Sequence, residues 1–135
     1  MEFQGNVIDF FGKQLEGLDC QKTTQAYIVG IFGRYRTAEF DLSKESLTLQ
    51  FAEARTQRNF AKFQTIGDWI FFSQSLMPQH LHYASKDYYD TVARLSFYSC
   101  YRILDRKWQV YEELADLFIP LNEEVSIRLN KVIYF

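Results

Sequence analysis

Proline, cysteine and histidine each occur only twice in this chain of 135 residues. So few prolines leave most of the backbone free to form helices, because proline lacks the amide hydrogen that a helix interior needs. The two cysteines, Cys20 and Cys100, make neither a disulfide framework nor a cysteine-rich metal site. Cys100 lies among apolar residues, and we interpret it as a buried thiol that packs like a small hydrophobic side chain.

Long apolar runs and a strong net charge are missing as well. The longest strictly apolar run, Trp69–Phe72, is far shorter than the ~20 residues of a membrane-spanning helix. The net charge of −2, from 15 basic and 17 acidic residues, gives no overall field that would attract a nucleic acid. The N-terminus is acidic where a signal peptide would be basic. We therefore expect a cytoplasmic protein with no membrane span, and nucleic acid is the least favoured partner.

Aromatic residues, in contrast, are abundant: the chain has 13 Phe, 9 Tyr and 2 Trp. Each buried aromatic side chain removes roughly 150–250 Å² from water, so a few of them could form most of the core. The remainder exceeds what a small core buries easily, and we expect an exposed apolar patch. Such a patch predicts a protein partner or a homo-oligomer.

Apolar residues recur at helical spacing through nearly the whole sequence, and no segment has a clear strand pattern. We predict an all-α, single-domain helical bundle of five to seven helices over residues 1–135. Gly17 is predicted to end the first helix and Asp19 to cap the second. Gly30 and Gly33 lie one turn apart in that second helix, where glycine costs ~1 kcal/mol against alanine. This indicates close approach by a neighbouring helix.

Capping residues and prolines predict the boundaries of the later helices. Asp41 or Ser43 is predicted to cap a helical stretch that begins near residue 44. The helical period then continues to residue 77 and fits either one long helix or two helices broken near Asn59. Pro78 ends this stretch, because the residue before a proline is disfavoured in the α region. Ser85 is predicted to cap the next helix.

The last third of the chain has three further boundary signals. Asp105 is predicted to begin a helix that Pro120 ends, and Asn122 to begin the last helix. The final residues, KVIYF, are a candidate contact element, because bulky apolar side chains at a chain end are costly in water unless they are covered.

Both histidines lie in the stretch MPQHLHYASKDYYD, residues 77–90. On a helix His80 and His82 would point about 200° apart and could not share a metal. In extended chain they would face the same way, with Asp87 or Asp90 as a third ligand. No Glu-x-x-His, His-Glu-x-x-His or Cys-x-x-Cys motif is present. We predict no metal and no cofactor, and interpret the stretch as a turn between two helices.

The run Asp-Tyr-Tyr-Asp at residues 87–90 is a second candidate site. On a helix its two carboxylates share a side and could hold a proton or a cation between them. We favour a helix start, because aspartate in the first turn is stabilised by the helix dipole. The ligand-binding candidates in this stretch are His80, His82, Asp87, Tyr88, Tyr89 and Asp90.

Asp68 is the remaining ligand-binding candidate, since it lies in a strongly apolar stretch beside Trp69. A buried aspartate has a raised pKa unless it is paired, and perturbed carboxylates cluster at functional sites. We favour a structural ion pair with Arg94 or Arg102 from another helix.

Arg55, Arg58 and Lys62 repeat at helical spacing and could meet phosphate. Glu53 lies nearby, and the chain has no recognisable nucleic-acid-binding motif. We favour a solvated helix face, with weak nucleic-acid binding as an alternative.

Three segments, FAKFQTIGDWIFFSQSLMPQHL, DYYDTVARLSFYSCYRIL and VYEELADLF, resemble a group of uncharacterised bacterial all-helical proteins. In that group a Gly-Asp pair precedes an apolar helix that ends near a proline, and an Asp-Tyr-Tyr helix start follows. The resemblance covers a little under half of the chain. It implies a bacterial, cytosolic protein in which the 77–90 turn is a fixed part of the architecture, and it implies no activity.

No nucleophile elbow, phosphate-binding loop or dinucleotide fingerprint is present, so we predict no catalytic residues. The favoured function is a non-catalytic interaction module that binds a protein partner or self-associates through an aromatic and apolar surface. The alternative is a helical bundle with an aromatic-lined pocket for a small apolar ligand or haem, which could be an enzyme. In that case His80 or His82 would be the axial ligand, and Tyr88 and Tyr89 would line the mouth.

Overall fold

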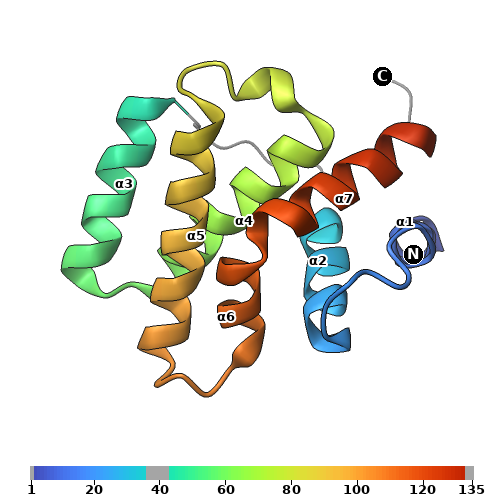
Figure 1. The fold of residues 1–135 in the computed structure, drawn as a ribbon, viewed down its shortest axis with the longest axis horizontal. Coiled ribbons are helices and arrows are strands. Elements are labelled where there is room, and N and C mark those ends of the chain that lie inside the picture. The colour runs from blue at the N-terminus through green and yellow to red at the C-terminus, as the bar shows by residue number, and fades with distance from the viewer. Residues whose placement is uncertain (1, 36–42, 133–135) are drawn as a thin grey trace.

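A computed structural model describes the chain over residues 2–35 and 43–132. This part of the chain folds into seven α-helices and one short 3-10 helix, with no strand, which confirms the predicted all-α fold (Figure 1). The helices are α1 (Glu2–Gln14), α2 (Lys22–Tyr35), α3 (Lys44–Gln57), α4 (Phe60–Leu76), η1 (Pro78–His80), α5 (Lys86–Ile103), α6 (Gln109–Asp116) and α7 (Phe118–Val132).

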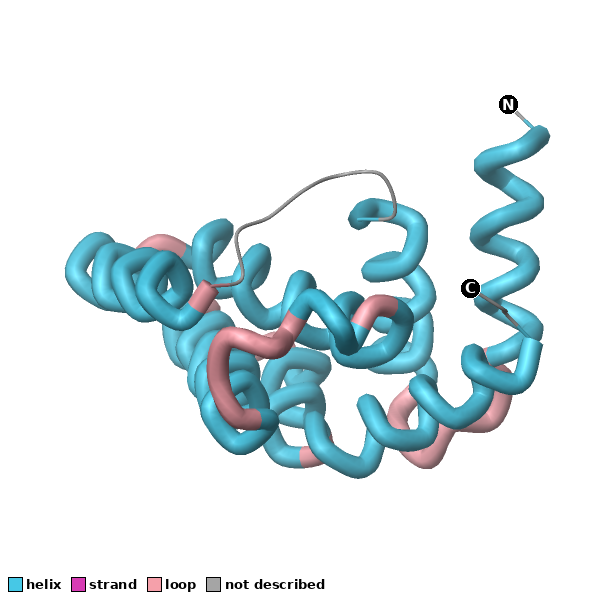
Figure 2. The backbone as a smooth tube through the Cα atoms, turned by 90° about the horizontal axis from the view of Figure 1, so that it is seen from above, coloured by secondary structure: helices cyan, strands magenta, loops and turns pink. Residues whose placement is uncertain are grey.

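Helix α4 is the centre of the fold and packs against α2, α3, α5 and α7. Its residues 66–73 are all buried, including those that a surface helix would present to water. Helix α1 lies at one edge of the molecule and packs on α2, as Figure 2 shows from above. None of the described helices has the length and apolar character needed to cross a membrane.

The helical pattern of residues 44–77 belongs to two helices, α3 and α4, rather than one. Arg58 ends α3 in a left-handed conformation with φ 49° and ψ 49°, and its amide donates to the carbonyl oxygens of Ala54 and Arg55. The side chain of Asn59 then accepts a hydrogen bond from the amide of Lys62 at 3.1 Å and caps α4. The break therefore lies at Arg58 and Asn59.

Two of the predicted caps and one predicted helix end are confirmed. The hydroxyl of Ser43 accepts from the amide of Ser46, and the hydroxyl of Ser85 accepts from the amide of Tyr88. Helix α4 ends at Leu76, just before Pro78. The alternative cap Asp41 lies outside the described residues, as does most of the KVIYF segment.

Gly17 lies in the turn that follows α1 and has a left-handed φ of 73°. Four other predicted boundaries are wrong. Helix α2 begins at Lys22, so Asp19 is too early to cap it. Asp105 has a left-handed φ of 56° in a turn, and α6 begins only at Gln109.

Pro120 does not end a helix but lies in the first turn of α7, where its missing amide leaves no hydrogen bond unmade. Asn122 is not a helix start either. It is buried within α7, and its side-chain amide donates to the carbonyl oxygen of Phe71 and to Oγ of Ser75, each at 3.0 Å. The polar side chain that resembled a cap instead bonds to α4.

The two glycines of α2 have different roles. A Cβ on Gly33 would collide with Ile8 of α1, so the predicted close approach of a neighbouring helix holds at this position. A Cβ on Gly30 would lie 2.8 Å from Nη1 of Arg34, one turn further along α2. Gly30 therefore leaves room for the Arg34 side chain to turn back along its own helix.

Candidate functional site

The stretch 77–90 forms the corner between α4 and α5 and includes η1. His80 and His82 are both exposed there. Nδ1 of His82 lies 2.8 Å from the carbonyl oxygen of Gln79, and its ring packs on Tyr83. Within residues 2–35 and 43–132, no group of three or more His, Cys, Asp or Glu side chains could hold a metal ion. The corner is a capped turn.

The acidic residues of the corner do not act as a pair. Asp87 is exposed in the first turn of α5, whereas Asp90 is buried. Asp90 accepts from Nζ of Lys86 at 2.7 Å and from Nε2 of Gln74 at 3.1 Å. The hydroxyl of Tyr88 lies 2.6 Å from Oγ1 of Thr48 and joins α5 to α3. The favoured interpretation of this run as a helix start is therefore confirmed.

A pocket of about 410 Å³ lies between this corner and α7, and we call it the corner pocket. Tyr89 is the one ligand-binding candidate among its described lining residues, which do not include either histidine. The lining residues are Gln74, Pro78, Leu81, Lys86, Tyr89, Asn122, Glu123, Ser126 and Ile127.

Asp68 is a fully buried carboxyl group that accepts hydrogen bonds from three side chains of α2. The hydroxyl of Tyr27 donates to Oδ1 at 2.7 Å. Nη2 of Arg34 and the hydroxyl of Tyr35 donate to Oδ2 at 3.0 Å and 2.9 Å. The guanidinium group of Arg34 also lies 5.2 Å from the ring centre of Tyr27 and 5.5 Å from that of Tyr35, which suits cation–π attraction.

The structural ion pair predicted for Asp68 thus exists, but the predicted partners are wrong. Nε of Arg94 donates to the carbonyl oxygen of Ala115 at 2.9 Å and ties α5 to α6. Arg102 lines a pocket near the end of α5. The cation that reaches Asp68 is Arg34, which lies 34 residues earlier in the chain.

Burial raises the pKa of Asp68 from 3.8 to about 6, against the opposing effects of the Tyr27 hydrogen bond and the charge of Arg34. Burial and the charge of Asp68 also raise the pKa of Tyr27, and raise that of Tyr35 to about 12. Both tyrosines therefore stay protonated near neutral pH and can only donate to the carboxylate. The arrangement joins α2 firmly to α4 and fixes the ring of Tyr27.

The fixed ring of Tyr27 forms part of a surface groove of about 790 Å³ between α2 and α6, which we call the aromatic groove. Trp108 stands in this groove at the start of α6 with 60% of its surface exposed. The lining residues are Thr23, Ala26, Tyr27, Phe60, Leu104, Lys107, Trp108, Gln109, Val110 and Tyr111.

The second wall of the groove is also held in place. Nε2 of Gln64 donates to the hydroxyl of Tyr111 at 2.9 Å. The rings of Tyr27 and Tyr111 pack edge to face with their centres 5.5 Å apart. The sequence predicted only a helix between Asp105 and Pro120 in this region and did not indicate the groove. The charged run that precedes Trp108, residues 105–107, was the one local sign that the indole is exposed.

The basic face predicted from Arg55, Arg58 and Lys62 is divided in the structure. Lys62 forms an ion pair with Glu53. Arg55 and Arg58 line a separate pocket together with arginines of α5 and of the turn that follows it.

Comparison with known proteins gives no assignment of this site. No known protein family, curated protein or solved structure matches the chain. The function therefore has to be inferred from the geometry of the groove and its neighbours.

Proposed function

We propose that this protein is a non-catalytic helical module that binds an apolar segment of a protein partner in the aromatic groove. The observation that carries this proposal is the exposed indole of Trp108 inside an apolar groove. An exposed ring of this size is unfavourable in water, and covering it on binding is favourable. Tryptophan and tyrosine are also the side chains most enriched at the energetic centres of protein interfaces.

The groove is organised for binding before a partner arrives. Tyr27 is oriented by Asp68 and Tyr111 by Gln64, so the two aromatic walls lose little freedom on binding. Walls that are already ordered reduce the entropic cost of association. The buried carboxylate contributes to function through this positioning and need not meet the ligand.

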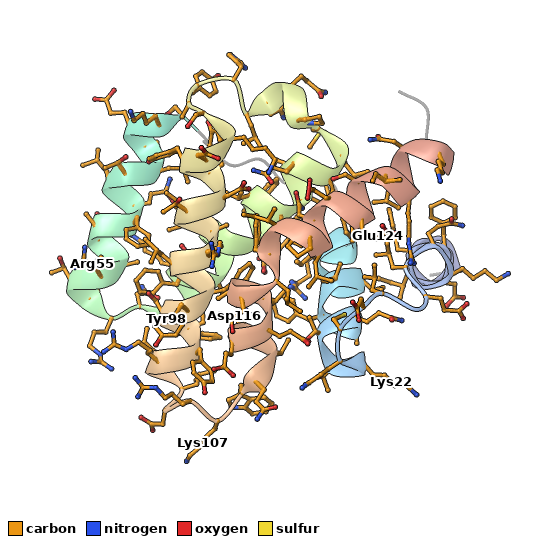
Figure 3. The ribbon with its side chains drawn as sticks, in the orientation of Figure 1. Lys22, Arg55, Tyr98, Lys107, Asp116 and Glu124 are labelled. Atoms are coloured by element: carbon orange, nitrogen blue, oxygen red, sulfur yellow. The ribbon has the colours of Figure 1, made fainter. Side chains whose placement is uncertain are left out.

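Charge and size indicate the kind of segment that would fit. Lys107 lines the groove, and the exposed Lys22 adjoins the lining residue Thr23. Both lysines lie at the same end of the molecule, as Figure 3 shows. Complementary charge favours acidic residues beside the apolar ones in the partner. The volume of about 790 Å³ is within the ~300–1,000 Å³ of small-ligand pockets, so the groove has room for only a few side chains of a partner.

The proposal is tested by selecting peptides from a displayed random library and measuring their binding from the fluorescence anisotropy of a dye-labelled peptide, a signal that does not depend on Trp108. In the wild-type protein, intrinsic fluorescence adds a second readout, because Trp69 is buried and a shift on binding reports mainly on Trp108. We expect apolar peptides with acidic flanks, and an affinity loss of about tenfold or more in Trp108→Ala. Tyr83→Ala is the matched control, because Tyr83 is similarly exposed but lies at the distant 77–90 corner. Peptides that bind Trp108→Ala as tightly as wild type contradict the proposal.

Sedimentation velocity distinguishes self-association through the aromatic groove from binding of a different protein. A dimer that forms with rising concentration and disappears in Trp108→Ala would make a second copy the occupant. The haem alternative finds less support, because neither His80 nor His82 lines the aromatic groove or the corner pocket. Haem bound in either place would lack these imidazoles as axial ligands.

A further inference from the structure

Four arginine side chains line one pocket of about 350 Å³, which we call the arginine pocket. Arg55 lies in the last turn of α3 and Arg58 caps that helix, while Arg102 lies in the last turn of α5 and Arg106 in the turn that follows. The pocket lies at the opposite end of α5 from the 77–90 corner. Figure 3 labels Arg55, one of its lining residues. The other lining residues are Phe63, Ser99 and Ile103.

The positive charge of this pocket is not balanced by the protein. No lining residue is acidic, and within residues 2–35 and 43–132 none of the four arginines has an ion pair. All four arginines are exposed, so water and salt reduce their mutual repulsion but leave four unpaired cations around one pocket. The nearby cation Lys62 is instead paired with Glu53. The pocket therefore presents unpaired guanidinium groups that an anion with several negative charges would neutralise.

Helix capping explains only part of the cluster. Arg55 and Arg102 lie in last turns, where a cation is stabilised by the helix dipole. Arg58 and Arg106 have left-handed backbones with φ values of 49° and 58°. Glycine or asparagine adopts this conformation with less strain. Termination of the helices therefore does not account for arginine at these two positions.

We propose that the arginine pocket binds a small soluble anion with two adjacent phosphate groups. Guanidinium groups form paired hydrogen bonds with phosphate oxygens. A phosphate monoester carries about −1.5 to −2 charges near neutral pH, so two phosphate groups approximately balance four arginines. The four cations surround a single cavity, whereas a nucleic-acid backbone is followed by an extended stripe of cations. This site shares no lining residue with the aromatic groove and stands independently of it.

The experiment is calorimetric titration of the full chain with inorganic pyrophosphate at low ionic strength. We expect saturable binding of one pyrophosphate per chain, weakened by salt, with inorganic phosphate about tenfold weaker. Arg58→Asn and Arg106→Asn should each weaken pyrophosphate binding by about tenfold. Each should melt at the same temperature as wild type or higher, because asparagine relieves the left-handed strain. Lys62→Gln, which removes a neighbouring paired cation, should leave the affinity unchanged.

Three results would overturn this assignment. The first is the absence of saturable pyrophosphate binding to the folded wild-type protein. The second is an equal loss of affinity in Lys62→Gln, which would show general attraction to a basic surface. The third is tighter binding of a random single-stranded oligonucleotide than of pyrophosphate, lost in the same Asn variants, which would assign the pocket to nucleic acid.

Discussion

The hydroxyl group of Tyr27 donates a hydrogen bond of 2.7 Å to Oδ1 of Asp68, which lies 41 residues later in the chain. This bond links a buried carboxyl in the central helix to one wall of an open groove. The polar interior and the proposed binding surface are therefore one connected structure. A substitution of Tyr27 or Asp68 should therefore change both the free energy of unfolding and the affinity of the groove for its partner.

Tyr27→Phe removes the shortest hydrogen bond to Asp68 and keeps the ring. We expect the free energy of unfolding at neutral pH to fall by about 1–3 kcal/mol, because a buried carboxylate loses a donor. The pKa of Asp68 should rise further for the same reason. Urea unfolding measures the first effect. Tyr88→Phe is the control, since its hydroxyl bonds at the exposed surface, and an equal loss in both variants would contradict the special role of Tyr27.

The pKa of Asp68 predicts a pH dependence of stability. Its value of about 6 in the folded protein lies above the ordinary 3.8, so the folded state holds this proton more tightly than the unfolded state. The resulting contribution to stability is complete below about pH 4 and is lost as the pH rises through about 6. The difference between these two pKa values corresponds to about 3 kcal/mol. In Asp68→Asn this titration is absent, so the difference in unfolding free energy between wild type and variant should change over that range. A constant difference would contradict the prediction.

Gly67→Ala should destabilise the contact between α4 and α5. A Cβ at this position would lie 2.8 Å from two ring atoms of Phe97, and both residues are buried. Overpacking of this kind costs about 1–3 kcal/mol, which thermal unfolding detects. Gly12→Ala is the matched control, because a Cβ there meets nothing within 4 Å. It should be neutral or stabilising by up to about 1 kcal/mol, since Gly12 lies inside helix α1. If both variants changed the melting temperature equally, the contact between the added Cβ and Phe97 could not be the cause of the destabilisation.

The two thiols should differ sharply in reactivity. Cys100 is fully buried, as expected from its apolar neighbours, and burial raises the pKa of its thiol. Cys20 is only half-buried. Burial, and after it the charges of Glu113 and Asp19, raise the pKa of its thiol. An aromatic disulfide reagent should modify only Cys20 in the native protein and both thiols in denaturant. Cys20→Ser should then leave no thiol that reacts before unfolding, and rapid labelling of Cys100 would contradict its burial.

Local signals in the sequence were sufficient for the helices and for some of their ends. The helical period, the caps Ser43 and Ser85 and the stop at Pro78 depend on residues within one or two turns. The predicted start at Asn122 was wrong because its side chain bonds to α4 across the core instead of to its own helix. A capping residue is recognisable locally, but a distant partner for the same side chain is not.

The order of the amino acids was enough to predict an all-α chain, a carboxyl group in an apolar segment and an excess of aromatic rings. The packing of the helices was needed to show that Asp68 bonds to α2, that Trp108 lies in an open groove and that four arginines line one pocket. The reason is physical: periodicity shows which side chains share a face of one helix. Which faces meet depends on the packing of helices far apart in the chain, and the sites are built where those faces meet.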